Sequence, residues 1–223
     1  MFDKWLKIPA HYYLRITALT ILIVGIAVSN VLMSIGAIWI ISNWLIEADF
    51  KNYSLRLKSS PEVWLILLFL AYAILTLAWS DDFWYGFKDI KIKLPLLAIP
   101  LALGTGKPLE SKVFYFILYV FIGIVAYTSL YNFIWYNYIY ESPTDIRQMS
   151  KFISQIRFAT LVDLAIFSTV FLLFEKRIKL IFGLPIILWF IFYIYKAQIL
   201  NGYVLFGILL LYTIYFAIKK IPR

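Results

Sequence analysis

Two charged residues stand out in the stretch FISQIRFATLVDLAIF, because the residues after Arg157 are otherwise apolar enough for a membrane span. Arg157 stands at the entrance of this run and Asp163 lies inside it. A guanidinium at the membrane edge can donate several hydrogen bonds to a phosphate. The alternative is an arginine that extends towards lipid headgroups without a specific ligand. An aspartate inside a span needs a proton or a polar partner.

The spacing of the two residues argues against a catalytic pair. Six residues of helix correspond to a rise of about 9 Å, and side chains six apart point to different faces. We therefore expect Arg157 at the outer interface and Asp163 as a structural polar contact between helices. The candidate partners of Asp163 lie in one later loop: Lys196, Gln198 and Asn201.

The segment before Arg157 carries two interleaved stripes. Its apolar positions recur at helical spacing: Ile146, Met149, Ile153 and Ile156. Its polar positions recur every four residues: Arg147, Lys151 and Gln155. With Ser142-Pro143 as a helix start, this pattern predicts an interfacial helix along the outer face, with a partly basic side.

A second basic segment, Ser80–Pro95, holds three lysines among three aspartates. The lysines are Lys88, Lys91 and Lys93, and the aspartates are Asp81, Asp82 and Asp89. The lysines either bind an anion such as a phosphate or pair with the aspartates and lipid headgroups. Two adjacent carboxylates are weak evidence for a metal, so we predict no metal and no cofactor.

The residue inventory excludes several chemistries. The chain has no cysteine, which excludes disulfides and thiolate sites. Its one histidine, His11, is expected near the cytoplasmic end of the first span and cannot act as a base on the other side. No serine, histidine and acid set is available, so the sequence assigns no catalytic residue.

Composition indicates a membrane protein. Of the 223 residues, 63% are hydrophobic and only 15% are charged, which is typical of a chain whose solvent is the bilayer. The net charge of +9 comes mostly from short clusters between apolar runs. This pattern reflects membrane topology, and nucleic-acid binding is excluded as the function.

The apolar runs predict an all-α, polytopic transmembrane bundle of about eight spans. The later runs are Val63–Trp79, Leu94–Leu103, Val113–Tyr138, Phe158–Phe174, Ile181–Tyr195 and Tyr203–Ile218. The first run, Arg15–Leu45, is expected to fold as a hairpin of two short spans that turns at Ser29-Asn30. The hairpin puts two thirds of the 21 Lys and Arg residues on the cytoplasmic side, whereas one long span divides them almost evenly. Both termini are then cytoplasmic. We expect residues 1–223 to form a single integral membrane domain.

Four blocks together resemble the O-antigen ligase family of bacterial membrane glycosyltransferases. They are SNVLMSIGAIWIISNWL, LAWSDDFWYGFKDIKIKLPLLAIPLAL, FISQIRFATLVDLAIF and AQILNGYVLFGILLLY. The second block is the most specific, with a span ending in Trp-Ser, a Gly-x-Lys-Asp loop and a Lys-Leu-Pro run. The resemblance covers nearly all of the chain and corresponds to the N-terminal half of such a ligase.

The resemblance implies transfer or polymerisation of glycans carried on undecaprenyl diphosphate, at the periplasmic face of the inner membrane, without metal or cofactor. It also implies that Arg157 holds the lipid diphosphate. The residues with a weaker claim to that role are Lys88, Lys91, Lys93, Arg147 and Lys151. The large periplasmic loop of the family, with its histidine, and the C-terminal spans have no counterpart among these 223 residues. We therefore expect this chain to be incomplete or inactive alone.

Two other classes of function remain open. A small transporter would use Asp163 and Lys196 to line a polar path. A non-catalytic membrane subunit would instead assemble with a separate partner chain.

Overall fold

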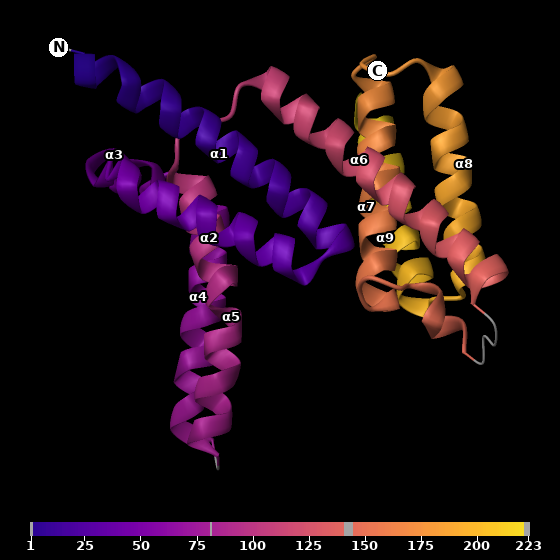
Figure 1. Cartoon of the computed structure of the whole chain (residues 1–223), viewed down its shortest axis with the longest axis horizontal. Helices are drawn as coiled ribbons and strands as arrows, with labels where there is room; N and C mark the ends of the chain where they lie inside the picture. Colours follow the sequence, from indigo (N-terminus) through magenta and orange to yellow (C-terminus); the bar gives the residue numbers. More distant parts are fainter. Residues whose placement is uncertain (1, 81, 141–144, 221–223) are drawn as a thin grey trace. The chain divides into compact units, whose positions relative to one another are not determined.

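The computed structural model describes residues 2–80, 82–140 and 145–220, and at residues 2–9, 89, 91, 92, 94, 96 and 216–220 it describes the backbone alone. Helices make up 87% of the structure, and the residues described contain no strand (Figure 1). The α-helices are α1 Phe2–Val28, α2 Asn30–Glu47, α3 Phe50–Lys58, α4 Pro61–Leu75, α5 Phe83–Thr105, α6 Ser111–Ile134, α7 Gln155–Phe174, α8 Leu180–Ala197 and α9 Leu200–Lys220. Shorter turns of other helix types are η1 Thr76–Trp79, η2 Trp135–Ile139 and η3 Ile146–Met149.

The chain divides into two compact units. Unit 1 comprises Met1–Leu22 and Val31–Phe114, and unit 2 comprises Ile23–Asn30 and Tyr115–Arg223. The boundaries fall inside α1 and near the start of α6. Each unit is described by itself below.

The predicted turn between the first two spans is confirmed. α1 ends at Val28 and α2 begins at Asn30, so Ser29 alone separates the two helices. Within unit 1, the helices approach closely at Gly36, where a Cβ atom would lie 2.5 Å from the backbone nitrogen of Leu22. Glycine at this position therefore allows backbone to meet backbone.

The start of α4 has two features that are common at helix N-termini. Pro61 occupies the first turn after Ser60, and Glu62 adds an acidic side chain at the positive end of the helix. The Ser60 hydroxyl donates to the carbonyl oxygen of Arg56 at 2.9 Å instead of capping α4. The side chain thereby ties α4 to the end of α3.

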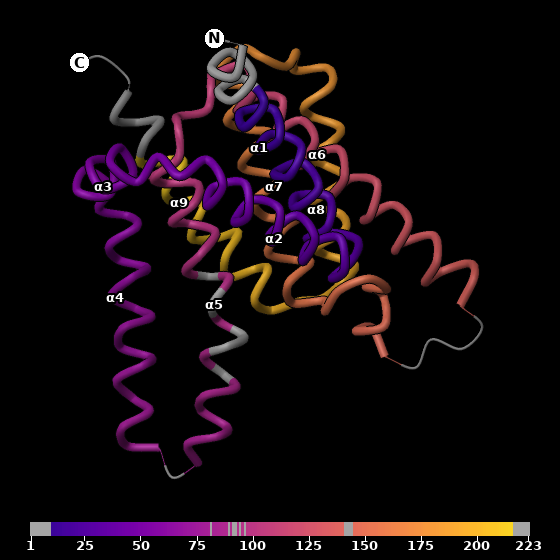
Figure 2. Tube along the Cα trace, turned by 60° about the vertical axis from the view of Figure 1, so that its left-hand side comes forward, coloured from indigo at the N-terminus to yellow at the C-terminus, as the bar shows by residue number. Residues whose placement is uncertain are grey.

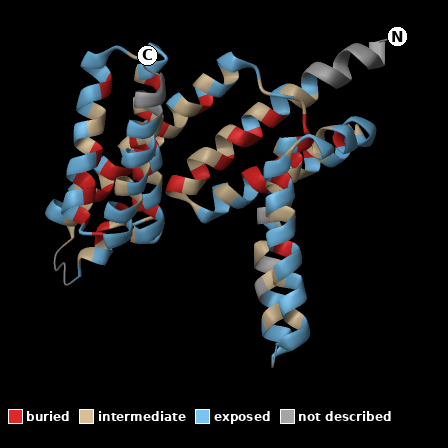
Figure 3. Cartoon of the chain, turned by 180° about the vertical axis from the view of Figure 1, so that it is seen from behind, coloured by how far each residue is buried: buried red, intermediate tan, exposed pale blue. Residues whose placement is uncertain are grey.

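Helices α4 and α5 pack side by side as a hairpin (Figures 1 and 2). The outward side chains of α4 are large and apolar, and they include Trp64, Leu65 and Leu68. Most of this hairpin is exposed (Figure 3). Such a surface suits lipid, because lipid tails are as apolar as the side chains themselves.

Helix α5 contains two internal prolines, Pro95 and Pro100. A proline has no backbone N–H and interrupts the helical hydrogen-bond ladder. The charged half of α5 precedes Pro95, and the apolar half follows it. The apolar half alone is shorter than a typical membrane span.

The core of unit 2 is built on α7, which packs against α8 and α9 (Figure 2). Phe158 and Val162 on α7 are fully buried. The Phe158 ring meets the ring of Tyr193 on α8 edge to face, with centroids 5.4 Å apart. Apolar packing of this kind gives α7 its position at the centre of the unit.

Six helices of the described structure are long and apolar enough to cross a membrane. They cover Ala10–Val28, Asn30–Glu47, Pro61–Trp79, Ser111–Ile139, Gln155–Phe174 and Leu180–Ala197. The predicted helical, polytopic architecture is confirmed at this level. The two further spans of the predicted eight correspond to α5 and α9.

Candidate functional site

The predicted basic site lies at the end of unit 2 where η3 packs against α7 and α8. The segment that precedes α7 is anchored by apolar side chains. Met149 is buried, and Ile146 and Ile153 pack against the core of the unit. These anchors fix the position from which the charged side chains extend.

The predicted interfacial helix over this segment is wrong. Only Ile146–Met149 forms a short helical turn, and α7 begins at Gln155. The backbone N–H of Lys151 donates to Asn132 Oδ1 at 3.3 Å, and the Ser150 hydroxyl donates to the Ile153 carbonyl at 2.7 Å. Side-chain bonds of this kind compete with helix formation. The proposed helix start at Ser142-Pro143 lies outside the described residues.

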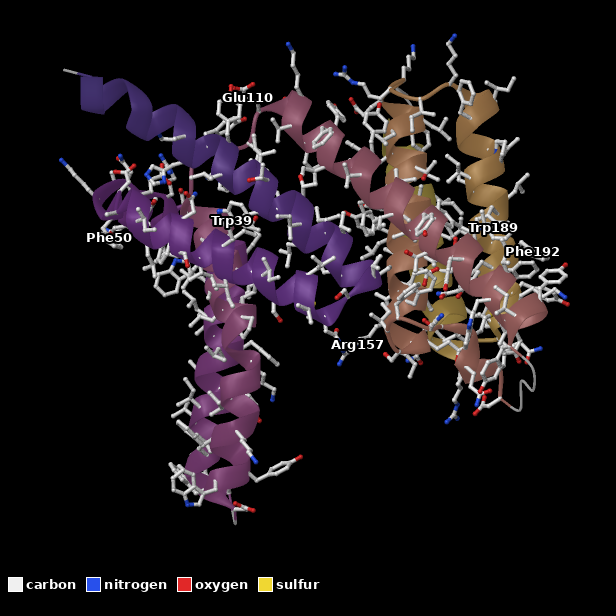
Figure 4. The ribbon with its side chains drawn as sticks, in the orientation of Figure 1. Trp39, Phe50, Glu110, Arg157, Trp189 and Phe192 are labelled. Atoms are coloured by element: carbon white, nitrogen blue, oxygen red, sulfur yellow. The ribbon has the colours of Figure 1, made fainter. Side chains whose placement is uncertain are left out.

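Arg157 lies in the first turn of α7, and its side chain is exposed (Figure 4). It makes no hydrogen bond or ion pair with any residue that the structure describes. Its guanidinium is therefore available to an anion from outside the protein. Its place in the first turn of α7 matches the expected entrance of the apolar run.

The side chains of Arg147 and Lys151 are exposed, but each contacts another side chain. Arg147 Nε lies 3.9 Å from Asp145 Oδ2. Lys151 Nζ donates to the Tyr131 hydroxyl at 3.1 Å and lies 5.0 Å from the ring centre of Trp135. The lysine is thus held on the aromatic end of α6 by cation–π contacts.

The Gln155 side chain does not lie with the other members of the predicted polar stripe. Its amide nitrogen donates to the Ala197 carbonyl at 2.7 Å and to the Ile146 carbonyl at 3.2 Å. The side chain joins η3 to the end of α8. Gln155 is therefore a structural residue that orients the segment before Arg157.

The lysines of α5 are described only in part. Lys88 is exposed and Lys93 is half-buried, whereas the side chain of Lys91 lies outside the described residues. Because they belong to unit 1 and Arg157 to unit 2, the described geometry assembles only the unit 2 members of the predicted site.

Asp163 is fully buried in α7, and neither carboxylate oxygen has a hydrogen-bond partner in the described structure. Its Oδ2 faces the start of α9, where it lies 3.9 Å from the point at which a Cβ of Gly202 would stand. The predicted partners do not reach it, since the side chains of Lys196, Gln198 and Asn201 are all exposed. Lys196 instead lies 6.0 Å from the ring centre of Phe192. The proposed polar contact is therefore absent from the residues described.

Two further buried polar groups of unit 2 escaped the sequence analysis. Asn132 of α6 lies beside the Tyr193 hydroxyl, but neither the Asn132 Nδ2 nor that hydroxyl has a hydrogen-bond partner in the described structure. The Asn132 Oδ1 receives the Lys151 bond. An asparagine inside the apolar run Val113–Tyr138 was the available signal, because polar residues within spans commonly hold helices together.

The described residues offer no group of three or more His, Cys, Asp or Glu side chains that could hold a metal ion. An open groove on α6 and α8 is apolar and is lined by Tyr127, Leu130 and Trp189, among others. The indole nitrogen of Trp189, which is labelled in Figure 4, donates to the Ser129 hydroxyl at 2.8 Å. The groove therefore presents hydrocarbon and no group that would orient a polar ligand.

The fold and the site together define a multi-pass helical membrane protein, with an arginine at the end of unit 2 that forms no ion pair with any residue described. Comparisons with protein-family models, with curated proteins and with solved structures give no significant match.

Proposed function

We propose that this chain is part of an O-antigen ligase-like glycosyltransferase of the bacterial inner membrane, which handles undecaprenyl-diphosphate-linked glycans at the periplasmic face. The sequence blocks quoted above motivate the family. The single observation that carries the site is the exposed, unpartnered guanidinium of Arg157 in the first turn of α7.

The proposed topology has eight spans and cytoplasmic termini. It puts η2, η3 and the turn between α8 and α9 on one side of the membrane. Contacts inside unit 2 support this grouping, because Gln155 bonds to both Ala197 and Ile146. The same topology puts α3 and the end of α5 together on the other side. A contact inside unit 1 supports this, since Arg56 Nη1 donates to the Thr105 carbonyl at 2.9 Å.

In the proposed reaction, the bond between the sugar anomeric carbon and a diphosphate oxygen breaks. The hydroxyl oxygen of the acceptor forms the new bond and releases its proton, and the diphosphate leaves with the electron pair. Arg157 stabilises the charge that develops on this leaving group, through two parallel hydrogen bonds to phosphate oxygens. Arg147 and Lys151 add positive potential at the same end of unit 2.

Binding of undecaprenyl diphosphate to the purified chain in zwitterionic lipid nanodiscs tests the role of Arg157. Loss of a charged hydrogen-bond pair costs about 1.5–3 kcal/mol, so Arg157→Ala is expected to weaken binding by about ten- to a hundredfold. Arg157→Lys keeps the charge without the planar fork and is expected to fall in between. In a full-length version of the protein, Arg157→Ala is expected to abolish glycan transfer.

Arg177→Ala is the matched control, because Arg177 is also exposed in unit 2 but follows the opposite end of α7, where its guanidinium lies 4.3 Å from the Tyr115 ring centre. Equal weakening by Arg157→Ala and Arg177→Ala would remove Arg157 from the binding site.

A second candidate function rests on Asp163. A carboxyl group buried without a hydrogen-bond partner is typical of proton and cation pathways in transporters. This candidate predicts that single cysteines along α7 next to Asp163 react with water-soluble reagents, and that Asp163→Asn abolishes uptake into proteoliposomes. If the chain is a non-catalytic subunit, we expect no uptake into proteoliposomes and no loss of diphosphate binding in these variants.

A further inference from the structure

Unit 1 contains a buried arginine that forms no ion pair with any side chain that the structure describes. Arg15 lies on α1, and the residue is 5% exposed. Its Nε and Nη2 atoms are shielded from solvent and have no hydrogen-bond partner among the residues described. The Tyr12 ring lies close to it, with the ring centre 5.7 Å from the guanidinium carbon.

A guanidinium cannot escape burial by losing its proton, because arginine stays charged in proteins. A buried charge is tolerated only when it is paired and hydrogen-bonded. Arg15 therefore requires an acceptor.

The nearest carboxylate is already shared. Glu47 of α2 is the acidic group that acts most strongly on Arg15. However, Glu47 Oε2 accepts the Tyr53 hydroxyl at 3.0 Å, and Glu47 Oε1 lies 3.8 Å from Lys107 Nζ. Burial, followed by the hydrogen bond to Glu47, raises the pKa of the Tyr53 hydroxyl to about 12. Tyr53 therefore remains a donor to Glu47 at neutral pH.

The other polar groups around this carboxylate are also engaged. Thr105 accepts from the Trp44 indole nitrogen at 3.0 Å, and its hydroxyl donates to the Leu101 carbonyl at 2.6 Å. Asp49 accepts two bonds from Asn52, at 2.8 and 2.9 Å. None of these oxygens accepts a hydrogen bond from Arg15 Nε or Nη2 in the described structure.

Positive charge gathers around Arg15. Glu47 acts on Arg15 and also pairs with Lys107, which lies at the rim of the cluster with about a third of its side chain exposed. Arg56 acts on Arg15 as a second positive charge. An anion from outside would balance these cations.

Gly106 leaves room next to Arg15. Its backbone has ordinary dihedral angles, with φ −62°, so the fold does not require glycine for its conformation. A Cβ at this position would collide with Arg15 Nη1 and with the Ala102 carbonyl. The absent side chain keeps the backbone of α5 close to the guanidinium without covering it with a methyl group.

We propose that Arg15, with Arg56 and Lys107, forms a binding site for a phosphate group. The site is independent of Arg157 and of glycan transfer. A phosphate offers the several acceptor oxygens that a guanidinium needs, and it adds the missing negative charge. The group comes either from the headgroup of an anionic phospholipid or from free phosphate.

Thermal unfolding of the delipidated full chain in a neutral detergent tests the site. Addition of phosphatidylglycerol is expected to raise the unfolding temperature by several degrees, by mass action on the folded state. Phosphatidylcholine and inorganic phosphate are the two comparison arms. Stabilisation by phosphatidylglycerol alone assigns a lipid headgroup, and stabilisation by inorganic phosphate as well assigns a site for free phosphate.

The variant Arg15→Met distinguishes a phosphate-binding role of Arg15 from a role in a structural ion pair. If the site binds phosphate, the variant is at least as stable as the wild type without lipid, because the uncompensated charge is gone, and it loses the response to phosphatidylglycerol. Apparent affinity for the lipid is expected to fall at least tenfold. Arg177→Met in unit 2 is the matched control and keeps the full response.

Two outcomes would overturn the proposal. One is an unfolding temperature of the wild type that no phosphate compound changes. The other is an Arg15→Met variant that responds to phosphatidylglycerol as the wild type does. If Arg15→Met does not fold, native mass spectrometry of Lys107→Met decides, since loss of this rim cation is expected to weaken phosphatidylglycerol retention about two- to threefold, and unchanged retention counts against the site.

Discussion

His11 on α1 and Asn43 on α2 form a reciprocal pair. His11 Nδ1 lies 2.8 Å from Asn43 Oδ1, and Asn43 Nδ2 donates to the His11 carbonyl at 3.0 Å. The sequence analysis had only excluded His11 from chemistry outside the membrane. The pair gives it a structural role, because a polar bond between two helices in an apolar bundle fixes their register.

We expect Asn43→Leu to lower the free energy of unfolding by about 1–2 kcal/mol, since it removes both bonds and leaves the His11 ring without its partner. Chemical denaturation in detergent measures this change. Ser42→Ala, at the neighbouring exposed position of α2, is the control and should change little. Equal effects of the two variants would contradict the role of the pair.

Gly36→Ala is expected to destabilise unit 1. The new methyl group would stand 2.5 Å from the Leu22 nitrogen and 2.7 Å from its Cα, and backbone atoms cannot rotate away. The cost is expected to be about 1–3 kcal/mol, typical of overpacking. Gly123→Ala on α6 has no atom within 4 Å of the added carbon, so it should be neutral or stabilising. An unfolding temperature that falls equally in both variants would disprove the close approach.

Gln155→Leu is expected to loosen the segment that leads into α7. The variant loses the two bonds to the Ala197 and Ile146 carbonyls, and Leu cannot replace them. Hydrogen exchange of the amides in 145–154 should become at least severalfold faster, while α8 amides far from Ala197 stay protected. Thr160→Ala serves for comparison, because the Thr160 hydroxyl bonds only within its own helix.

Asp163→Asn is expected to leave the free energy of unfolding within about 0.5 kcal/mol of the wild type, or to raise it. The substitution breaks no hydrogen bond, because neither carboxylate oxygen has one in the described structure. It also removes the need to bury a potential charge. A loss of more than about 1 kcal/mol would show that Asp163 has a stabilising partner after all. Unchanged stability with lost uptake would favour the transport function.

A local signal in the sequence predicted one helix boundary correctly. Ser29-Asn30 between two apolar runs marked the break between α1 and α2. Turn and cap residues act through their own backbone, so a short window of sequence is sufficient.

The segment before Arg157 shows where periodicity misleads. Met149 and Ile153 recur at helical spacing, but they are anchors of an irregular segment that is held by Asn132 and by a local serine bond. Tertiary contacts outweigh a short periodic pattern, because a few apolar residues can reach one core from several backbone shapes. The place of Arg157 at the start of α7 was predictable from the sequence. The inward direction of the Gln155 side chain was not.

The cluster around Arg15 was not predictable at all. Its members come from α1, α2, α3 and the end of α5, and no local pattern connects them. The sequence showed Arg15 and Arg56 only as cytoplasmic cations of the topology. The proximity of Arg15 to both Arg56 and Glu47 emerges only from the packing of unit 1.

The prolines of α5 have a consequence for how this helix meets the bilayer. The helical hydrogen-bond ladder is interrupted at Pro95 and again at Pro100. The half of α5 before Pro95 carries Lys88 and Lys93, and the half after it is apolar. Only the apolar half is suited to hydrocarbon, and alone it is shorter than the hydrophobic thickness of a bilayer. α5 therefore has the greatest hydrophobic mismatch of the eight proposed spans. Lipids with shorter acyl chains should relieve it, and the depth of Lys88 should follow bilayer thickness more closely than that of any residue on α7.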